Sequence, residues 1–170
     1  IAFCDQDDVW KSDKLTRAVA LLATEPQEFP ALYCSRTVVC NADLQPRSTS
    51  PFFEMEPSFA NALVQNIGGG NTMVLNRAAI DLVQDTAHHA HSVVSHDWWI
   101  YQLITAAGGT IIYDPEPTLY YRQHPGNAIG SNDTWFASAV RLWKVLNGQY
   151  VGWNDANLTA LEAAHHWMTD

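Results

Sequence analysis

An acidic cluster stands close to the start of the chain, where its residue types could hold a metal ion. Residues 1–4 form a short apolar run without glycine or proline, which is typical of a buried strand. They are followed directly by Asp5, Gln6, Asp7 and Asp8. Carboxylates gathered at a strand end repel one another, and a divalent cation would offset that repulsion. Mg²⁺ typically binds one or two protein carboxylates together with water and substrate phosphates. A solvated acidic turn that caps the next helix is an equally good interpretation of these residues alone.

A run of three glycines, Gly68, Gly69 and Gly70, precedes Asn71 and an apolar segment at residues 72–75. Glycine lets the backbone approach a ligand closely, but it also builds tight turns, and the turn is the more common outcome. The glycine run alone therefore does not predict a binding site.

A helix that runs to about residue 107 is predicted to begin at Ser95, which is a suitable N-cap. Asp97 then falls in the first turn, where the helix dipole favours a carboxylate, so it has a purely structural explanation. The functional alternative is a general base, flanked by His96, that takes a proton from a bound hydroxyl. Aromatic faces can stack on a sugar, and of Trp98 and Trp99 we expect one to do so and the other to pack in the core.

Arg122 and His124 stand at the end of a predicted strand, residues 118–122, which follows a strand at 110–113 and a turn at 114–117. A single histidine before a Pro-Gly turn is usually a surface residue. Together with the acidic cluster, however, His124 becomes a candidate metal ligand, because imidazole and carboxylates suit Mn²⁺ or Mg²⁺.

The remaining elements alternate between helices and strands, which predicts an α/β fold. A helix begun by Ser12 is predicted from an apolar stripe made of Leu15, Ala18, Val19 and Leu22. Residues 31–40 predict one or two strands, and residues 45–57, which contain three prolines, predict a loop. Ser58 and Asn76 are expected to cap two further helices.

The composition is that of one globular domain. The chain has 170 residues, of which 47% are hydrophobic, and a net charge of −9, so nucleic acid and anionic membrane surfaces are not expected partners. Its three cysteines are predicted to be buried free thiols in a reducing compartment. With no signal peptide and no apolar run of about 18 residues, a cytoplasmic location is expected. Because the sequence lacks an initiator Met and opens within a strand, we expect it to be a fragment.

The segments DQDDVW, GGGNTMVLNR, HDWW and YRQHPGNAIG, in this order, resemble the family 2 glycosyltransferases. The resemblance is to the bacterial group that includes rhamnosyltransferases and builders of cell-surface polysaccharide. It covers residues 1–131 as part of a catalytic domain, whereas residues 132–170 match only as a helical tail. It implies a GT-A-type fold, a mixed sheet flanked by helices. In that family a further N-terminal half binds the nucleotide, and this chain would lack it.

The resemblance also implies how a donor would be bound. The family's D-x-D acids hold the Mg²⁺ or Mn²⁺ that bridges the diphosphate of a nucleoside-diphosphate sugar, and they correspond here to Asp5 and Asp7, with Asp8 nearby. A later histidine of the family often contacts the metal or diphosphate, and it would be His124, with Arg122 close enough to help.

The acceptor side is implied in the same way. The family's general base corresponds to Asp97, and direct displacement by the deprotonated hydroxyl would invert the anomeric carbon. Residues 68–71 would line the junction between donor and acceptor, and His96, Trp98 and Trp99 would lie beside it.

The expected function is therefore inverting transfer of a sugar, with rhamnose as the family-level choice, to a saccharide or lipid-linked saccharide. This places a cytoplasmic protein at the inner face of the membrane. Without the nucleotide-binding half we expect weak donor binding, and a sheet edge left exposed could pair with another copy of the chain. Two other classes remain open: a metal-dependent phosphoester hydrolase that uses the same acids, and a non-catalytic carbohydrate-binding module that uses the aromatic surface.

Overall fold

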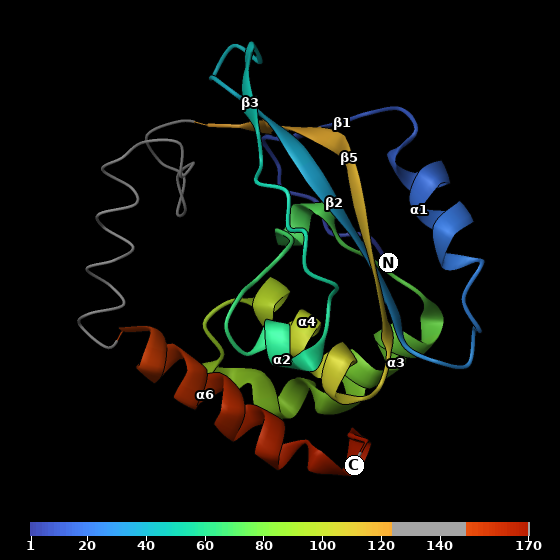
Figure 1. Ribbon diagram of the computed structural model, residues 1–170, viewed down its shortest axis with the longest axis vertical. Helices are drawn as coiled ribbons and strands as arrows, with labels where there is room; N and C mark the ends of the chain where they lie inside the picture. The colour runs from blue at the N-terminus through green and yellow to red at the C-terminus, as the bar shows by residue number, and fades with distance from the viewer. Residues whose placement is uncertain (124–148, 170) are drawn as a thin grey trace.

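The computed structural model describes residues 1–123 and 149–169, which form a mixed sheet with helices on both faces (Figure 1). The sheet is built around two long strands, β2 (Ala31–Cys40) and β5 (Thr110–Arg122), which pair in parallel. The strand order is β1-β5-β2-β3, and β4 pairs with β2 beside β3. The short strands are β1 (Val9–Trp10), β3 (Pro46–Thr49) and β4 (Val74–Leu75). The mixed α/β architecture expected from the sequence is confirmed, and it is compatible with a GT-A-type fold.

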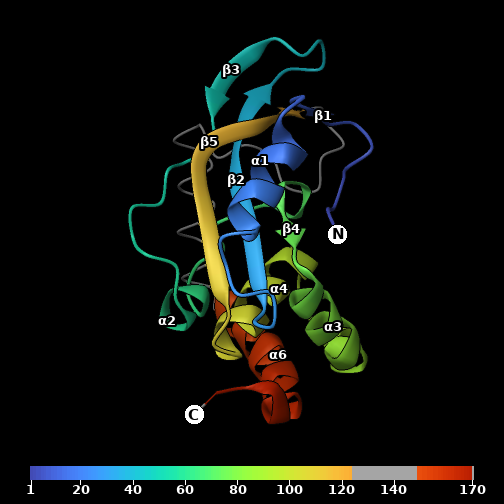
Figure 2. The ribbon, with the colours of Figure 1, turned by 90° about the vertical axis from the view of Figure 1, so that its right-hand side faces the viewer.

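Successive residues of β2 serve the two faces of the sheet. Ala31 and Tyr33 pack with the apolar side of helix α1 (Lys14–Leu22), whereas Leu32 and Cys34 belong to the larger core on the opposite face. This division follows from the two-residue period of a strand. Figure 2 shows α1 lying across β2 and β5. Because both faces of the sheet are covered at β2, the sequence of this strand is a nearly continuous apolar run. Its bounds were predicted correctly for this reason.

Helix α4 (His96–Ala106), whose eleven residues include eight buried ones, contributes more residues to the larger core than any other element. The other helical elements are α2 (Phe59–Ala62), α3 (Arg77–Thr86), α6 (Gln149–Ala163), and the short 3₁₀ helices η1 (Gly70–Thr72), η2 (Ala87–Ser92) and η3 (His165–Trp167). The predicted caps of α2 and α3 are confirmed, because Ser58 accepts a hydrogen bond from Asn61 N and Asn76 from Ala79 N. Ser95 precedes α4 as predicted, but its side chain makes no capping bond.

Strand β5 runs without interruption through residues 114–117, where a turn was predicted. Its register against β2 shifts between Ser35 and Thr37, so Pro115 and Pro117 lie at an irregularity in the pairing. Proline is compatible with a strand at such a place, because it removes one ladder donor without ending the strand. The predicted turn was therefore wrong. The predicted loop at 45–57 was also partly wrong, since it contains β3.

Helix α1 is rotated relative to the prediction. It begins at Lys14 after Asp13 instead of at Ser12, and it buries Lys14, Ala18 and Leu22. Leu15 and Val19 from the predicted stripe are 44% and 59% exposed. The buried positions follow an i, i+4, i+8 spacing, so a lysine takes the place in the apolar face that the stripe had given to leucine.

The first residues do not form the predicted buried strand. Ala2 makes an isolated antiparallel bridge with Val74, while Ile1 is 62% exposed and Cys4 is exposed. The backbone pairs with β4 on one side, through Ile1 N to Leu75 O at 3.0 Å, and this pairing leaves the side chain of Ile1 uncovered. All three cysteines are free, but only two are buried, so the prediction was wrong for Cys4.

The C-terminal segment packs on the same core as the preceding residues. Ala160 and Leu161 of α6 are 3% exposed and join the core cluster of α4. The boundary at 131/132 and the first helix of the predicted tail lie outside the described residues, so the division into two parts stays a prediction.

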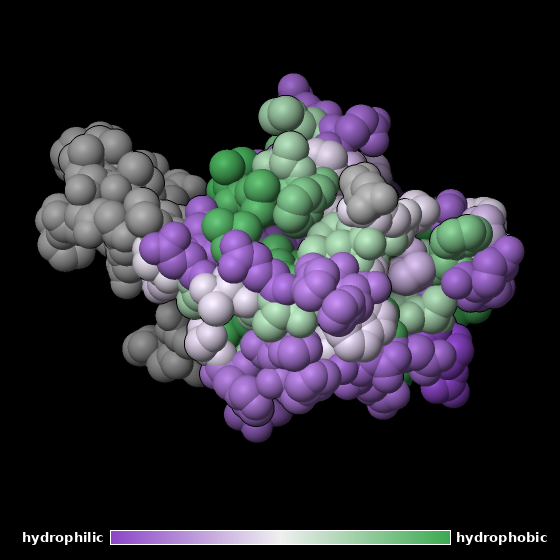
Figure 3. Space-filling model, turned by 90° about the horizontal axis from the view of Figure 1, so that it is seen from below, coloured by the Kyte–Doolittle hydropathy of each residue, from purple (hydrophilic) through white to green (hydrophobic). Residues whose placement is uncertain are grey.

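Most of the surface at the α6 end of the molecule is hydrophilic, but hydrophobic side chains gather on part of it (Figure 3). Around α2, large apolar side chains reach solvent, with Met55 and Val64 each 72% exposed. Within residues 1–123 and 149–169, no helix has the length and apolar character needed to cross a membrane.

Candidate functional site

The acidic turn, residues 5–8, leads into β1, which pairs with the C-terminal part of β5. Asp8 N donates to Asp5 O at 3.4 Å and closes the turn. Asp5 is exposed, and Asp7 is half-buried. The turn borders an open depression with a volume of about 400 Å³ that is lined by Cys4, Asp5, Gln6 and Asp7. The carboxylates predicted to hold a metal therefore face a space that a ligand can enter.

Asp8 has a different role, because both of its carboxylate oxygens are engaged. Asn71 Nδ2 donates to Oδ2, and the backbone N of Arg122 donates to Oδ1 at 3.2 Å. Burial raises the pKa of Asp8, against the lowering effect of these two hydrogen bonds, and the charges of Asp5 and Asp7 raise it further. Asp8 thus joins the acidic turn to residues 68–71, hereafter the glycine loop, and to the end of β5.

Arg122 supports the acidic turn from β5. Its Nε donates to Asp7 O at 2.9 Å, and its Nη1 donates to Ala42 O in the turn after β2. The arginine that sequence reasoning assigned to the donor therefore lies beside the acidic residues, where it holds the backbone of their turn. His124, predicted as a further metal ligand, lies outside the described residues.

The glycine loop passes close to two other segments. Gly68 is buried so tightly that an added Cβ would lie 2.9 Å from Cys34 Cβ. At Gly70 an added Cβ would overlap the Nε2 atom of His96. Gly69 is exposed. An added Cβ at Gly69 would lie 2.8 Å from Asn71 Oδ1, so all three positions are tight. Only Gly68 faces a Cβ atom, whereas the nearest atoms at Gly69 and Gly70 lie at the ends of side chains that can move. The loop reaches the acidic turn through Asn71 and the start of α4 through Gly70.

Asp97 lies where the glycine loop meets α4. Its Oδ2 accepts a hydrogen bond from Gly70 N at 3.2 Å, and its Oδ1 accepts one from Trp98 N at 2.7 Å. The residue is half-buried, and the adjacent His96 is exposed with its ring 5.2 Å from that of Phe3. Two backbone amides thus hold the carboxylate in place, and its partial exposure leaves it accessible to a ligand.

The two tryptophans after Asp97 are part of the core. Trp98 is 6% exposed and Trp99 is 3% exposed, and Trp98 Nε1 donates to Ala62 O at 2.7 Å. The prediction that one of them stacks on a sugar is therefore wrong. Because α4 is buried on nearly all sides, adjacent aromatic residues can both face protein.

The side chains available near the acidic turn decide whether the predicted metal ion could be bound there. Among the described residues, no three His, Cys, Asp or Glu side chains form a group that could hold a metal ion on their own. Mg²⁺ does not need such a group, because one or two carboxylates suffice when water and phosphate oxygens supply the rest. Asp5 and Asp7 beside the depression fit this mode of binding, whereas both oxygens of Asp8 already accept hydrogen bonds.

Sequence reasoning missed Lys14, whose side chain is fully buried next to the site. Its Nζ donates to Asn71 O and lies 3.9 Å from the centroid of the Trp10 ring. Burial lowers the pKa of Lys14 to about 8, although the charges of Cys4, Asp8 and Asp5 oppose this shift. Lys14 lies four residues before Ala18 and eight residues before Leu22, on the same face of the helix. This spacing is the sequence signal that could have identified it.

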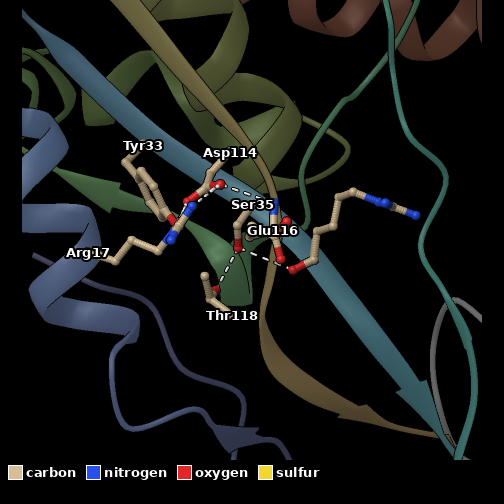
Figure 4. A network of polar contacts seen from close by, with 7 residues as sticks. Arg17, Tyr33, Ser35, Asp114, Glu116 and Thr118 are labelled. Carbon is tan, nitrogen blue, oxygen red and sulfur yellow. Dashed lines mark hydrogen bonds and ion pairs between the residues drawn. The ribbon is translucent and has the colours of Figure 1, made fainter.

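A second buried polar group anchors the sheet that carries the site (Figure 4). Asp114 is 3% exposed and accepts hydrogen bonds from Arg17, from Tyr33 Oη at 2.9 Å and from Glu116 N at 3.0 Å. Burial alone would raise the pKa of Asp114, but the hydrogen bonds outweigh it and the pKa lies below its usual value. The group ties α1 to β2 and β5 where their register shifts.

Replacement of Gly70 by Ala is expected to displace the His96 ring with little loss of stability, below about 1 kcal/mol. The new Cβ overlaps the far end of an exposed side chain, which can rotate away. NMR of the imidazole would show the movement, and thermal unfolding would measure the stability. Gly152→Ala is the control, because nothing lies within 4 Å of its added Cβ. An unchanged His96 resonance would contradict the close packing of these residues.

Comparison with known proteins gives one distant relationship. No family model matches the chain. The chain is 26% identical over 155 residues to the dTDP-rhamnosyl transferase RfbG of Shigella flexneri. The match covers 88% of this chain and 52% of the relative, so the chain spans about half the relative's length. This similarity supports a glycosyltransferase-like relationship for the chain.

Proposed function

We propose that the chain carries the metal-binding and catalytic part of an inverting glycosyltransferase that uses a nucleoside-diphosphate sugar. The observation that carries the proposal is the meeting of three segments that lie far apart in the sequence. The glycine loop contacts the acidic turn through the Asn71–Asp8 hydrogen bond and contacts the start of α4 through the Gly70–Asp97 hydrogen bond. This arrangement supports the proposal, because Asp5 and Asp7 would hold a cation on one side of the loop and Asp97 would act as a base on the other.

On the donor side, Asp5 and Asp7 would hold Mg²⁺ or Mn²⁺, and His124 is proposed as a further contact. When bound, the cation supplies neutralisation of the charge that develops on the leaving diphosphate. Arg122 keeps the turn in place through its hydrogen bond to Asp7 O. The name of the relative favours a dTDP-linked rhamnose as the donor, and rhamnose transfer to a saccharide is the reaction proposed here.

On the acceptor side, Asp97 would take the proton of the attacking hydroxyl. The amides of Gly70 and Trp98 hold its carboxylate in one orientation, so the base is positioned before the acceptor arrives. Attack opposite the departing diphosphate breaks the bond from the anomeric carbon to the phosphate oxygen and inverts that carbon. The acceptor is proposed to be a saccharide or lipid-linked saccharide at the inner face of the membrane.

Calorimetric titration of the protein with dTDP in the presence of Mn²⁺ tests the donor side. Wild-type protein is expected to bind, and Asp7→Ala is expected to weaken binding by about 100-fold, because one of the two proposed carboxylate ligands is lost. Asp85→Ala on α3 serves as the control, since it removes an exposed carboxylate of the same charge elsewhere. Equal affinities of the wild-type and Asp7→Ala proteins would refute the assignment.

The two other classes considered from the sequence predict different behaviour in the same preparation. A phosphoester hydrolase would release the nucleoside diphosphate from its sugar donor as fast without an acceptor as with one. A carbohydrate-binding module would bind sugar equally well after addition of a chelator or after Asp97→Asn.

A further inference from the structure

Lys14 is an unusual residue for the place it occupies. Its side chain is fully buried in the face of α1 that also contains Ala18 and Leu22, while its neighbour Leu15 is 44% exposed. Burying an ammonium group is unfavourable unless other groups compensate for the water it loses. A lysine in the inner face, with a leucine in the outer one, therefore indicates a task that an apolar residue would not perform.

The contacts of Lys14 show what compensates for its burial. The ammonium group donates a hydrogen bond to Asn71 O and lies 3.9 Å from the centroid of the Trp10 ring, which forms a cation–π contact. The carboxylates of Asp8 and Asp5 also favour its charged form. All of these groups belong either to the acidic turn and its continuation into β1 or to the glycine loop.

We propose that Lys14 is a positioning residue that holds the glycine loop against the acidic turn. The inference rests on the proposed function, because it concerns the same two segments. Asn71 receives the Lys14 hydrogen bond on its carbonyl and gives one from its side chain to Asp8. The preceding residue, Gly70, binds Asp97. Lys14 therefore fixes Asn71, which bonds the acidic turn and directly follows the residue that bonds Asp97.

This arrangement requires a donor at the end of a long side chain. Without it, the carbonyl of Asn71 would be buried without a partner, and the loop would gain by moving toward water. Lys14→Met keeps nearly the same length and removes both the donor and the charge. Lys14→Gln retains a donor but shortens the side chain and removes the charge. Lys11→Met is a matched control, because Lys11 precedes the same helix and is only half-buried.

Hydrogen exchange of the backbone amides, read by NMR in the full chain, is the first measurement. Lys14→Met is expected to speed exchange at Gly70 N and Thr72 N, which are both hydrogen-bonded, by at least 10-fold, with β2 and β5 unchanged. Lys14→Gln is expected to give an intermediate increase in the exchange rate, and Lys11→Met is expected to give no increase. Faster exchange throughout β2 and β5 would instead indicate a purely structural lysine and overturn the proposal.

Titration with Mn²⁺ and dTDP is the second measurement. Together with hydrogen exchange, it separates the proposed transferase function from the positioning role of Lys14. Lys14→Met is expected to lower the affinity by about 10-fold. If the wild-type protein does not bind, the proposed function fails, but the exchange measurement still decides the role of Lys14. Unchanged exchange at Gly70 and Thr72 in Lys14→Met overturns the positioning role whatever the affinity. Loss of the fold in both Lys14 variants would also overturn it, because Lys14 would then serve the core as a whole.

Discussion

Replacement of Asp97 by Asn is expected to lower kcat for sugar transfer by roughly 10³-fold and to leave the affinity for Mn²⁺ and dTDP within about 2-fold. Asparagine has the same shape as aspartate, and its oxygen can still accept the hydrogen bond from Gly70 N. It cannot accept a proton from the acceptor hydroxyl, so the loss should fall on the chemical step. Steady-state kinetics and calorimetry on the same preparation measure the two quantities.

The matched control for this prediction is Asp85→Asn, which makes the same chemical change at an exposed position of α3. A normal kcat in Asp97→Asn would show that Asp97 serves only to hold Gly70. A large loss of diphosphate affinity would instead place Asp97 on the donor side of the site. Both outcomes would contradict its assignment as the base.

Replacement of Asp114 by Asn is expected to lower the free energy of unfolding by about 2–3 kcal/mol at pH 7. The substitution removes the ion pair with Arg17 and weakens the acceptor for Tyr33 Oη. This expected loss lies at the lower end of the range for breaking the ion pair of a buried carboxylate, because Arg17 is 39% exposed and solvent screens its charge. Urea unfolding measures the change, and Glu116→Gln, which alters an exposed neighbour, is the control.

The pH dependence of this effect follows from the lowered pKa of Asp114 in the folded protein. The unfolded chain binds a proton at this residue more readily than the folded chain does. The stabilisation is therefore complete above the unfolded pKa of about 3.9 and is lost as the pH falls through the lower folded value. The difference in stability between wild-type and Asp114→Asn proteins should shrink from pH 7 to pH 3. A constant difference would contradict an ionic role.

Local patterns were enough to predict the elements whose residues all face protein or cap a helix. The bounds of β2 were visible because both faces of that strand are covered, and the starts of α2 and α3 because Ser58 and Asn76 satisfy backbone amides within their own segments. The unbroken course of β5 was not visible, because its continuation past Pro115 depends on pairing with β2.

The site was predictable only in its parts. Each segment has a recognisable composition, but the hydrogen bonds that join them, Asn71 to Asp8 and Gly70 to Asp97, connect residues 63 and 27 positions apart. No local signal specifies such pairs. The burial of Trp98 and Trp99 was missed for a related reason, since neighbouring aromatic residues suggested one outward face on a helix that has almost none.

The parallel pairing of β2 with β5 has a consequence for how the protein folds. Parallel strands cannot be joined by a tight hairpin, and here the segment between Cys40 and Thr110 must be closed as a loop before the pairing gains any stability. Contacts of such long sequence separation form slowly. Within the part of the chain that the structure describes, strand β1 pairs with β5, so the acidic turn acquires this anchor at the same late step. A chain still being synthesised, with β5 not yet available, would therefore carry the acidic turn without the strand pairing that anchors its C-terminal end.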